Sequence, residues 1–337
     1  MPPRALFYCK RNAEMGKNRY ALLTVDTEAL PKRAVTDHVK RLIWGEHDGG
    51  VAGVREMSAI GDEFGAKHVF FVDMCGAYAR REEIREVIAW LDQAGQDVQL
   101  HVHPEYLPND FWEKTPFKIE PRYLNQYTDV VKEEFLLSHF ATEISSVTGK
   151  TINAFRAGSF RWNATTLRVL ARLGIPLSFS NTTAAMNIGQ NPYSVPTNKP
   201  FRWSNGIIEI PVTEKNILPR VGKALWARFQ FPLSNFVKYR PWWASFVPYS
   251  VSRRDGFLVC LVHSWSLLYW DENGHAAYRD DARIEGYRKL IRSLSADYDV
   301  ITTSELLDLI RRGKIGLPHM EDIANTEIDS AIRRWKQ

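Results

Sequence analysis

Residues 20–28 read YALLTVDTE, an apolar run that ends in two acidic side chains. A short run of this kind predicts a buried strand that carries Asp26 at its carboxyl end. Residues 68–73 (HVFFVD) and 98–103 (VQLHVH) repeat the pattern, each with polar residues at the end of an apolar run. The sequence therefore predicts several buried strands that deliver polar side chains at their carboxyl ends.

Strands and helices alternate along the rest of the chain. Apolar spacing predicts helices at residues 80–94, 126–148, 164–173, 281–295 and 304–312, and further strands at 152–156, 177–180, 207–212, 257–263 and 299–302. Such alternation indicates a parallel sheet, either open and doubly wound or closed into a barrel. We predict an α/β fold, a distorted (β/α) barrel of seven or eight parallel strands over about residues 20–312.

The composition indicates one globular domain. The 337 residues are 45% hydrophobic and 25% charged, which excludes disordered and collagen-like chains. No linker or repeat divides the chain, so we expect a single domain with an insertion at residues 215–254 and a C-terminal tail at residues 313–337. The three cysteines form no C-x-x-C pair, and no secretory signal or membrane-spanning stretch is visible. We therefore expect free thiols and a cytoplasmic location.

Five polar residues fall at the ends of predicted strands: Asp26, His101, His103, Arg156 and His263. Alone, each has a structural explanation, because a strand-end carboxylate often caps a turn and a lone histidine is often a hydrogen-bonded core residue. In a parallel barrel, however, these strand ends form one rim, where active sites are built. Their coincidence predicts a catalytic site.

The two histidines have the spacing of metal ligands. Residues two apart in a strand point to the same face, so His101 and His103 converge, and Asp26 and Glu28 share this spacing. Two imidazoles and one carboxylate suit a divalent metal ion with an open coordination position. Zinc is the first choice, with cobalt or nickel next.

Five short motifs occur in order along the chain: TVDTE (24–28), VFFV (69–72), HVHP (101–104), FRAGSF (155–160) and LVHS (261–264). In this order they resemble the polysaccharide deacetylases of the NodB-homology type, also called carbohydrate esterase family 4. The D-x-E and L-H-x-H-P patterns resemble branches that act in surface-polysaccharide assembly. The resemblance implies a NodB-like deacetylase fold and a metal-dependent hydrolase of carbon–nitrogen bonds in linear amides, or of O-acetyl groups, on sugars.

The resemblance also implies roles in catalysis. Asp26 is similar to the catalytic base, Arg156 to the residue that orients the base, and His263 to the general acid. A backbone N–H near Ser159 would stabilise the tetrahedral oxyanion.

The remaining roles concern the metal and the substrate. By the same resemblance, the metal ligands are Glu28, His101 and His103. We expect four further residues to contact the substrate: Ser159, Asp73, Trp265 and Trp242.

The insertion at residues 215–254 has the most unusual composition. It contains eight Lys or Arg, nine aromatic residues and no Asp or Glu, in a chain with a net charge of +5. Such a segment suits an anionic membrane surface, a groove that stacks on sugars beside an acidic group, or an aromatic lid over the barrel. No nucleic-acid motif accompanies it, so we expect no nucleic-acid partner.

These observations predict a cytoplasmic N-deacetylase of an acetamido sugar in bacterial surface-glycan (O-antigen or capsule) biosynthesis. Its substrate would be lipid-linked or acidic, and the protein would contact the anionic inner membrane peripherally. A non-haem iron oxygenase is the first alternative, because two histidines and one carboxylate also bind ferrous iron. A catalytically inactive, glycan-binding barrel is the second. The identity of the bound metal separates the three.

Overall fold

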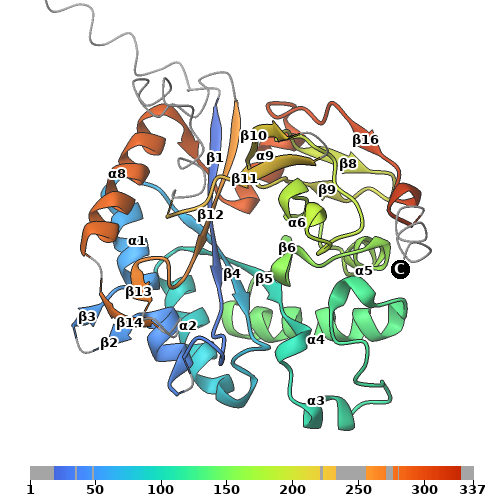
Figure 1. Ribbon diagram of the computed structural model, residues 1–337, viewed down its shortest axis with the longest axis horizontal. Coiled ribbons are helices and arrows are strands. Elements are labelled where there is room, and N and C mark those ends of the chain that lie inside the picture. Colours follow the sequence, from blue (N-terminus) through green and yellow to red (C-terminus); the bar gives the residue numbers. More distant parts are fainter. Residues whose placement is uncertain are drawn as a thin grey trace, which may run out of the picture.

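A computed structural model of the chain describes residues 19–34, 36–47, 49–220, 223–232, 256–270, 276–279 and 281–327. Its centre is a curled sheet, and most helices pack around the outside of this sheet (Figure 1). Along the sheet the strands are β12 (Phe257–His263), β1 (Tyr20–Thr27), β4 (His68–Asp73), β5 (Asp97–Val102), β6 (Ala154–Ala157), β7 (Leu177–Ser178), β9 (Ile208–Glu209), β8 (Phe201–Trp203) and β16 (Met320–Glu321), with β15 (Asp299–Val300) beside β1.

The run from β12 to β9 is parallel throughout, and β8 pairs antiparallel with β9. The described α-helices are α1 (Val54–Glu63), α2 (Arg81–Gln93), α3 (Asn109–Glu113), α4 (Val130–Thr148), α5 (Ala164–Leu173), α6 (Thr183–Asn187), α8 (Asp281–Asp297) and α9 (Thr303–Arg311). Antiparallel hairpins are formed by β2 (Glu46–His47) with β3 (Gly50–Val51), β10 (Glu214–Arg220) with β11 (Lys223–Arg228), and β13 (Leu268–Trp270) with β14 (Ala276–Arg279). Among the helices that the structure describes, none is long and apolar enough to span a membrane.

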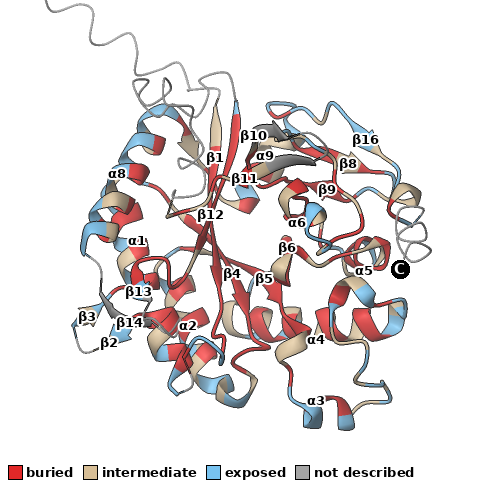
Figure 2. Ribbon diagram, in the orientation of Figure 1, coloured by how far each residue is buried: buried red, intermediate tan, exposed pale blue. Residues whose placement is uncertain are grey.

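The two faces of β1 show how the sheet divides the core. Leu23 and Val25 belong to the large cluster that packs against the outer helices, whereas Leu22 belongs to a second cluster inside the curled sheet. Thr24 and Asp26 lie on the same face as Leu22, because side chains alternate along a strand. The inner face is thus apolar at the start of the strand and polar at its end. Figure 2 shows that the strands of the sheet are buried almost throughout.

The outer edge of β12 is covered by irregular chain. The backbone N–H of Thr213 donates to Val259, and the backbones of Phe229 and Phe231 pair with Leu261. This pairing buries the rings of Phe229 (0% exposed) and Phe231 (6%) in the core. Both rings belong to the basic aromatic insertion, whose membrane, sugar-groove and lid interpretations stay predictions. Residues 221–222 and 233–254 of the insertion, and with them Trp242, lie outside the described residues.

The predicted architecture is confirmed: the fold is α/β, with parallel strands curled into a distorted barrel. The predicted bounds of β4, β12 and α5 agree with the structure residue for residue. Helix α4 begins later than predicted because the Asp129 side chain accepts the backbone N–H groups of Val131 and Lys132 and so caps the helix there. The described cysteines, Cys75 and Cys260, are buried free thiols, as expected.

Candidate active site

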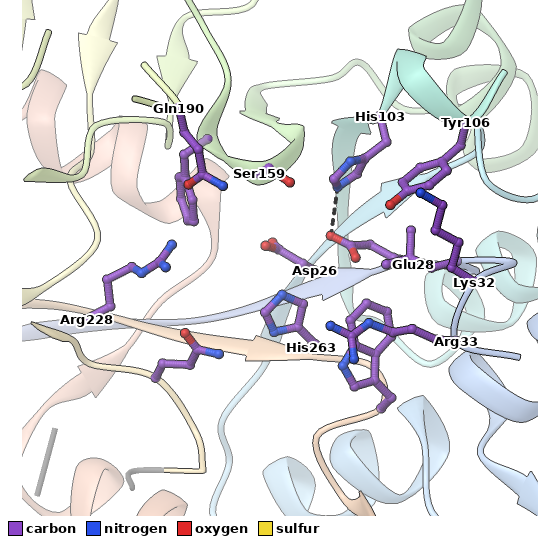
Figure 3. Close-up of a pocket in the computed structure, with 14 residues that line it drawn as sticks. Asp26, Glu28, Lys32, Arg33, His103, Tyr106, Ser159, Gln190, Arg228 and His263 are labelled. Carbon is purple, nitrogen blue, oxygen red and sulfur yellow. Dashed lines mark hydrogen bonds and ion pairs between the residues drawn. The ribbon is translucent and has the colours of Figure 1, made fainter. Parts of the chain in front are cut away.

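The carboxyl ends of the parallel strands open into a cavity of about 510 Å³. Six residues predicted for the site line it: Asp26, Glu28, His103, Ser159, His263 and Trp265 (Figure 3). Strand register explains the gathering, since Asp26 pairs with His263 across β1 and β12, and His101 pairs with Arg156 across β5 and β6. His101 and Arg156 are almost completely buried (1% and 0% exposed).

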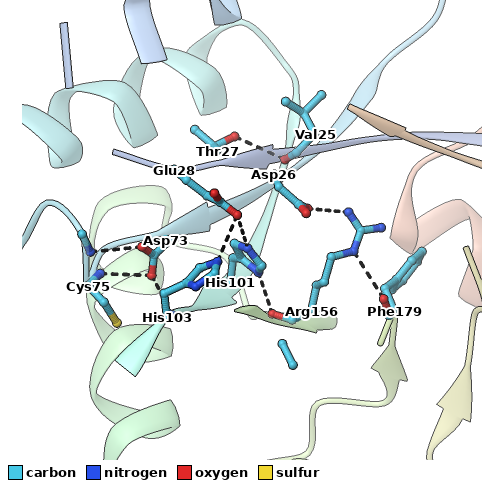
Figure 4. A network of polar contacts seen from close by, with 12 residues as sticks. Val25, Asp26, Thr27, Glu28, Asp73, Cys75, His101, His103, Arg156 and Phe179 are labelled. Atoms are coloured by element: carbon cyan, nitrogen blue, oxygen red, sulfur yellow. Dashed lines mark hydrogen bonds and ion pairs between the residues drawn. The ribbon is translucent and has the colours of Figure 1, made fainter. Parts of the chain in front are cut away.

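Glu28 and the two histidines form a three-point cluster. The Nε2 atoms of His101 and His103 lie 2.9 and 3.0 Å from the same oxygen, Oε1 of Glu28 (Figure 4). All three side chains are buried, and their ligand atoms lie within 4.8 Å of one another. This grouping has the size and donor set of a divalent metal site.

The opposite ring nitrogens fix the orientation of both imidazoles. Nδ1 of His101 lies 2.7 Å from the backbone carbonyl oxygen of Arg156, and Nδ1 of His103 lies 2.9 Å from the Glu105 carboxylate. A carbonyl oxygen can only accept, so Nδ1 of His101 carries the hydrogen, and a neutral ring then directs the lone pair of Nε2 at Glu28. Metal-bound histidines in proteins are held in this way.

Without a metal ion, the cluster must balance its charge with protons. Burial disfavours charge on every member, but the neighbouring Glu28 and Glu105 carboxylates raise the pKa of His103 well above its ordinary value. Despite its own burial, the pKa of Glu28 is held well below its usual value by the charge of His103 and hydrogen bonds from both histidines. A cation bound among the three side chains satisfies the same carboxylate and frees both rings to stay neutral. The residues therefore fit a divalent metal ion.

Asp26 is held from beneath by Arg156. Nη1 of Arg156 donates to Oδ1 of Asp26 at 2.5 Å, Nη2 donates to the Thr24 hydroxyl at 2.8 Å, and Nε donates to the Phe179 carbonyl at 3.3 Å. The guanidinium also lies over the Phe71 ring, 4.4 Å from its centroid. These contacts fix the Asp26 carboxylate at the cavity floor, beside Glu28.

His263 stands at the end of β12, on the opposite side of β1 and Asp26 from the strand β5 that leads to His101 and His103. Its ring stacks on Trp265 with centroids 4.9 Å apart, and its backbone N–H donates to the Ser266 hydroxyl at 2.9 Å. Burial lowers the pKa of His263, although the negative charges of Glu28 and Asp26 oppose this shift. Ligand atoms of Asp26, Glu28 and His263 also lie within 4.8 Å of one another. The imidazole is therefore placed to exchange a proton with a group bound in the cavity.

A strained turn, Gly158–Phe160, forms part of the cavity wall beside His103. Gly158 packs so closely on His103 that an added Cβ would lie 2.6 Å from its ring, and Ser159 and Phe160 both have positive φ (51° and 55°). Positive φ costs free energy for residues other than glycine, and such strain clusters at functional sites. Through this turn Ser159 lies in the cavity lining, as predicted.

Asp73 was expected to contact the substrate, but the structure places it elsewhere. Its side chain is fully buried and accepts backbone N–H groups from His103 (3.0 Å), Cys75 (3.2 Å) and Gly76 (3.0 Å). It does not belong to the cavity lining. The structure thus corrects its predicted substrate contact. The carboxylate of Asp73 is occupied by backbone N–H groups, two of them in the turn after its own strand, and it anchors the backbone that carries His103.

The cavity also contains residues that the sequence did not reveal. They are Leu30, Lys32, Arg33, Tyr106, Phe160, Gln190, Arg228 and Gln230. They come from connecting segments and from the β10–β11 hairpin, which carry no periodic pattern. Glu105 was also missed, although it follows His103 at the same two-residue spacing that singled out the histidine pair.

No protein-family model matches the sequence, and a search of curated proteins gives no significant match. Solved structures share its fold. A "putative polysaccharide deacetylase" from Mycobacterium smegmatis is 16% identical, with a TM-score of 0.54 over 90% of this chain and 93% of that one. A "putative glycoside hydrolase/deacetylase" from Parabacteroides distasonis is 13% identical, with a TM-score of 0.53 over 88% and 72% of the two chains.

A 4-alpha-glucanotransferase from Thermococcus litoralis is 11% identical, with a TM-score of 0.54 over 90% of this chain and 41% of that one. At these identities the similarity establishes the fold: a curled half-barrel of parallel strands, as in the deacetylase structures.

Proposed function

We propose that the protein is a metal-dependent hydrolase that removes the acetyl group from an acetamido sugar during the assembly of a bacterial surface glycan. One observation carries the proposal: Asp26, Glu28 and His263 meet at the floor of one cavity, and Glu28 also groups with His101 and His103 in a cluster that could hold a metal ion. The shared fold with deacetylase structures and the ordered motifs support it.

Glu28, His101 and His103 would hold the ion, and zinc is the ion that this donor set favours. When bound, it supplies Lewis acidity toward the acetyl carbonyl and lowers the pKa of water. The tautomer of His101 is set by the Arg156 carbonyl, and the ring of His103 is held by Glu105.

Asp26 would take the proton from the attacking water, and its ion pair with Arg156 keeps the carboxylate aimed at the cavity. The water oxygen bonds to the acetyl carbon, and the turn at Ser159 offers a backbone N–H to the developing oxyanion. His263 donates a proton to the sugar nitrogen as the carbon–nitrogen bond breaks. The products are acetate and a free amino sugar.

The purified protein tests this proposal directly. We expect about one equivalent of zinc, cobalt or nickel by elemental analysis, and acetate release from acetamido sugars that stops after chelation and returns with added metal. A protein that binds metal but releases no acetate from free, phosphorylated or lipid-linked acetamido sugars would refute the activity. A protein that binds sugar but no metal would instead be the inactive glycan-binding barrel.

A further inference from the structure

The cavity contains more positive than negative groups. Its described lining has two carboxylates, Asp26 and Glu28, and three cations, Lys32, Arg33 and Arg228. Both carboxylates are engaged, because Asp26 pairs with the buried Arg156 and Oε1 of Glu28 lies within 3.0 Å of Nε2 of both histidines. A bound divalent ion would add further positive charge. The cavity is therefore electrostatically suited to an anionic ligand.

Two of the cations lie at one end of the cavity. Figure 3 shows Lys32 and Arg33 on the side of Glu28, and Arg228 on the far side of Asp26. Arg33 covers the Trp265 ring at 5.2 Å, and Lys32 is exposed to solvent. These two residues contribute to the field of the cavity, whereas Arg228 is the cation that faces the floor from the opposite wall.

Arg228 is placed there by the β10–β11 hairpin. In the register of the hairpin it stands opposite Glu214, the acidic residue nearest to it across the two strands. Glu214, however, is used by the start of α6, where it accepts from the Thr182 hydroxyl and from the backbone N–H groups of Thr183 and Ala184. Arg228 consequently has no ion-pair partner among the residues that the structure describes.

Within the described part of the chain, no acceptor occupies the hydrogen-bond donors of Arg228. Its guanidinium lies 4.9 Å from the centroid of the Phe160 ring, which the strained turn presents beneath it. Burial lowers the pKa of Arg228, and the nearby Arg156 adds to this effect against the opposing charges of Glu214 and Asp26. A partly buried cation that lacks a counter-ion is stabilised when an anion binds beside it. The neutral donors Gln190 and Gln230 line the same cavity.

We propose that Arg228 binds an oxyanion of the substrate, so that the enzyme acts on acidic acetamido sugars. This inference rests on the proposed function and specifies its substrate class. The oxyanion is either a carboxylate on the sugar itself or a phosphate that links the sugar to its carrier, since the planar guanidinium fork binds both bidentately. The β10–β11 hairpin then determines which substrate is selected, and the residues at the strand ends carry out the hydrolysis.

Three matched substrates test the proposal with the metal-loaded full-length protein: an acetamido hexose, the same sugar with a 6-carboxylate, and its 1-phosphate. We expect kcat/KM to be at least about 10-fold higher for one of the acids than for the neutral sugar. The preferred acid identifies the source of the oxyanion. The preference should also weaken as the salt concentration rises.

Substitutions at Arg228 assign the preference to this residue. Arg228→Met should reduce the ratio of kcat/KM for the acidic and neutral sugars by about 10- to 100-fold, and Arg228→Lys should retain part of it. The matched control is Arg312→Met, which removes an exposed arginine outside the cavity lining and should keep the wild-type ratio. An Arg228→Met protein that folds and keeps the wild-type ratio would overturn the inference, as would a wild-type protein with no preference.

A binding measurement separates this inference from the proposed reaction. If no sugar releases acetate, the proposed function fails, and calorimetry with glucuronate and with inorganic phosphate still tests the anion site. At equal metal content, we expect Arg228→Met to weaken one of these anions by about 10-fold or more. Equal dissociation constants in the two proteins would refute the anion site on their own.

Discussion

The two walls of the cavity are built on different principles. The strand-borne wall consists of Asp26, Glu28 and His103, with His101 and Arg156 buried behind them, and each of these side chains has an intramolecular hydrogen-bond partner. The connection-borne wall consists of Ser159, Phe160, Gln190, Arg228 and Gln230, from a strained turn, a loop and the end of a hairpin.

This difference suits the strand-borne wall to catalysis and the connection-borne wall to substrate recognition. Groups that hold a metal or a proton need fixed positions, which parallel strands in register provide. Groups that recognise a substrate need unused donors and freedom to vary, which connections provide. The expected effects of substitution should therefore differ in size and in kind between the walls.

The largest effects should come from the histidines of the strand-borne wall. His101→Ala or His103→Ala removes one of the three proposed ligands, so metal content and acetate release should fall together. The loss should exceed the roughly 10- to 100-fold loss of metal affinity typical of residues outside the coordination sphere. Elemental analysis and steady-state kinetics check this. His139→Ala, on α4 and outside the cavity, is the control and should behave as wild type; a histidine variant that kept its metal would remove that residue from the triad.

Asp26→Asn should separate catalysis from metal binding. The amide cannot accept the proton from water, so kcat should fall by roughly 10²- to 10⁴-fold while the metal stays bound. Loss of the charge opposite Arg156 should also lower the free energy of unfolding by about 1–3 kcal/mol, measurable by denaturation. If the metal were lost with Asp26, the carboxylate would be a ligand instead, which its position within 4.8 Å of Glu28 and His263 allows.

His263→Ala should reveal a general acid by its dependence on the leaving group. Hydrolysis of the amide should slow by about 10²-fold, near the lower end for general acids because water reaches the cavity, while an aryl acetate ester should be affected much less. A protonated imidazole is lost as pH rises through its pKa, and burial lowers that pKa below the ordinary 6.5. The wild-type rate should therefore decrease as pH rises through a value below 6.5, and the rate of the variant should not show this decrease. Equal losses on both substrates would indicate a structural role.

The strand-borne wall was largely predictable from the sequence. Apolar runs that end in polar residues located β1, β5 and β12, and the two-residue spacing placed His101 with His103 and Asp26 with Glu28 on common faces. These are local patterns, and parallel strands bring their carboxyl ends to one rim without further information.

The connection-borne wall was not predictable in this way. The place of Arg228 depends on hairpin register, on the use of Glu214 by α6, and on the pairing of Phe229 with β12, all of which are long-range contacts. Positive φ at Ser159 is equally invisible in a residue type that rarely adopts it. Arg228 therefore stood out only as one of several cations in a basic segment.

Gly158 lies where the strand-borne and connection-borne walls meet. Its substitution should have an effect on metal affinity that is smaller than the effect of losing a histidine. In Gly158→Ala the new Cβ would lie 2.6 Å from both the ring of His103 and the backbone carbonyl oxygen of Val102, so the imidazole and the backbone that carries it must shift, which disturbs the contact of His103 with Glu28. We expect metal affinity to fall by about 10- to 100-fold, measured by competition with a chelator, with activity restored at high metal concentration. The control is Gly316→Ala, whose added Cβ meets no atom within 4 Å. Unchanged metal affinity would show that this shift does not disturb the cluster of Glu28, His101 and His103.

The smallest effect should come from Gln190 on the connection-borne wall. Its side chain lines the cavity, but it belongs to a loop after α6 and not to the strand ends that carry Asp26, Glu28 and the two histidines. Gln190→Ala removes a neutral hydrogen-bonding group, which is worth about a 2- to 10-fold change in binding. KM should rise by this factor, and kcat, metal content and thermal stability should stay near wild type, because the strand-borne wall is untouched. Steady-state kinetics with the preferred sugar measure both constants. A large fall in kcat with constant KM would place Gln190 in contact with the reacting group and would contradict the division between a catalytic and a recognition wall.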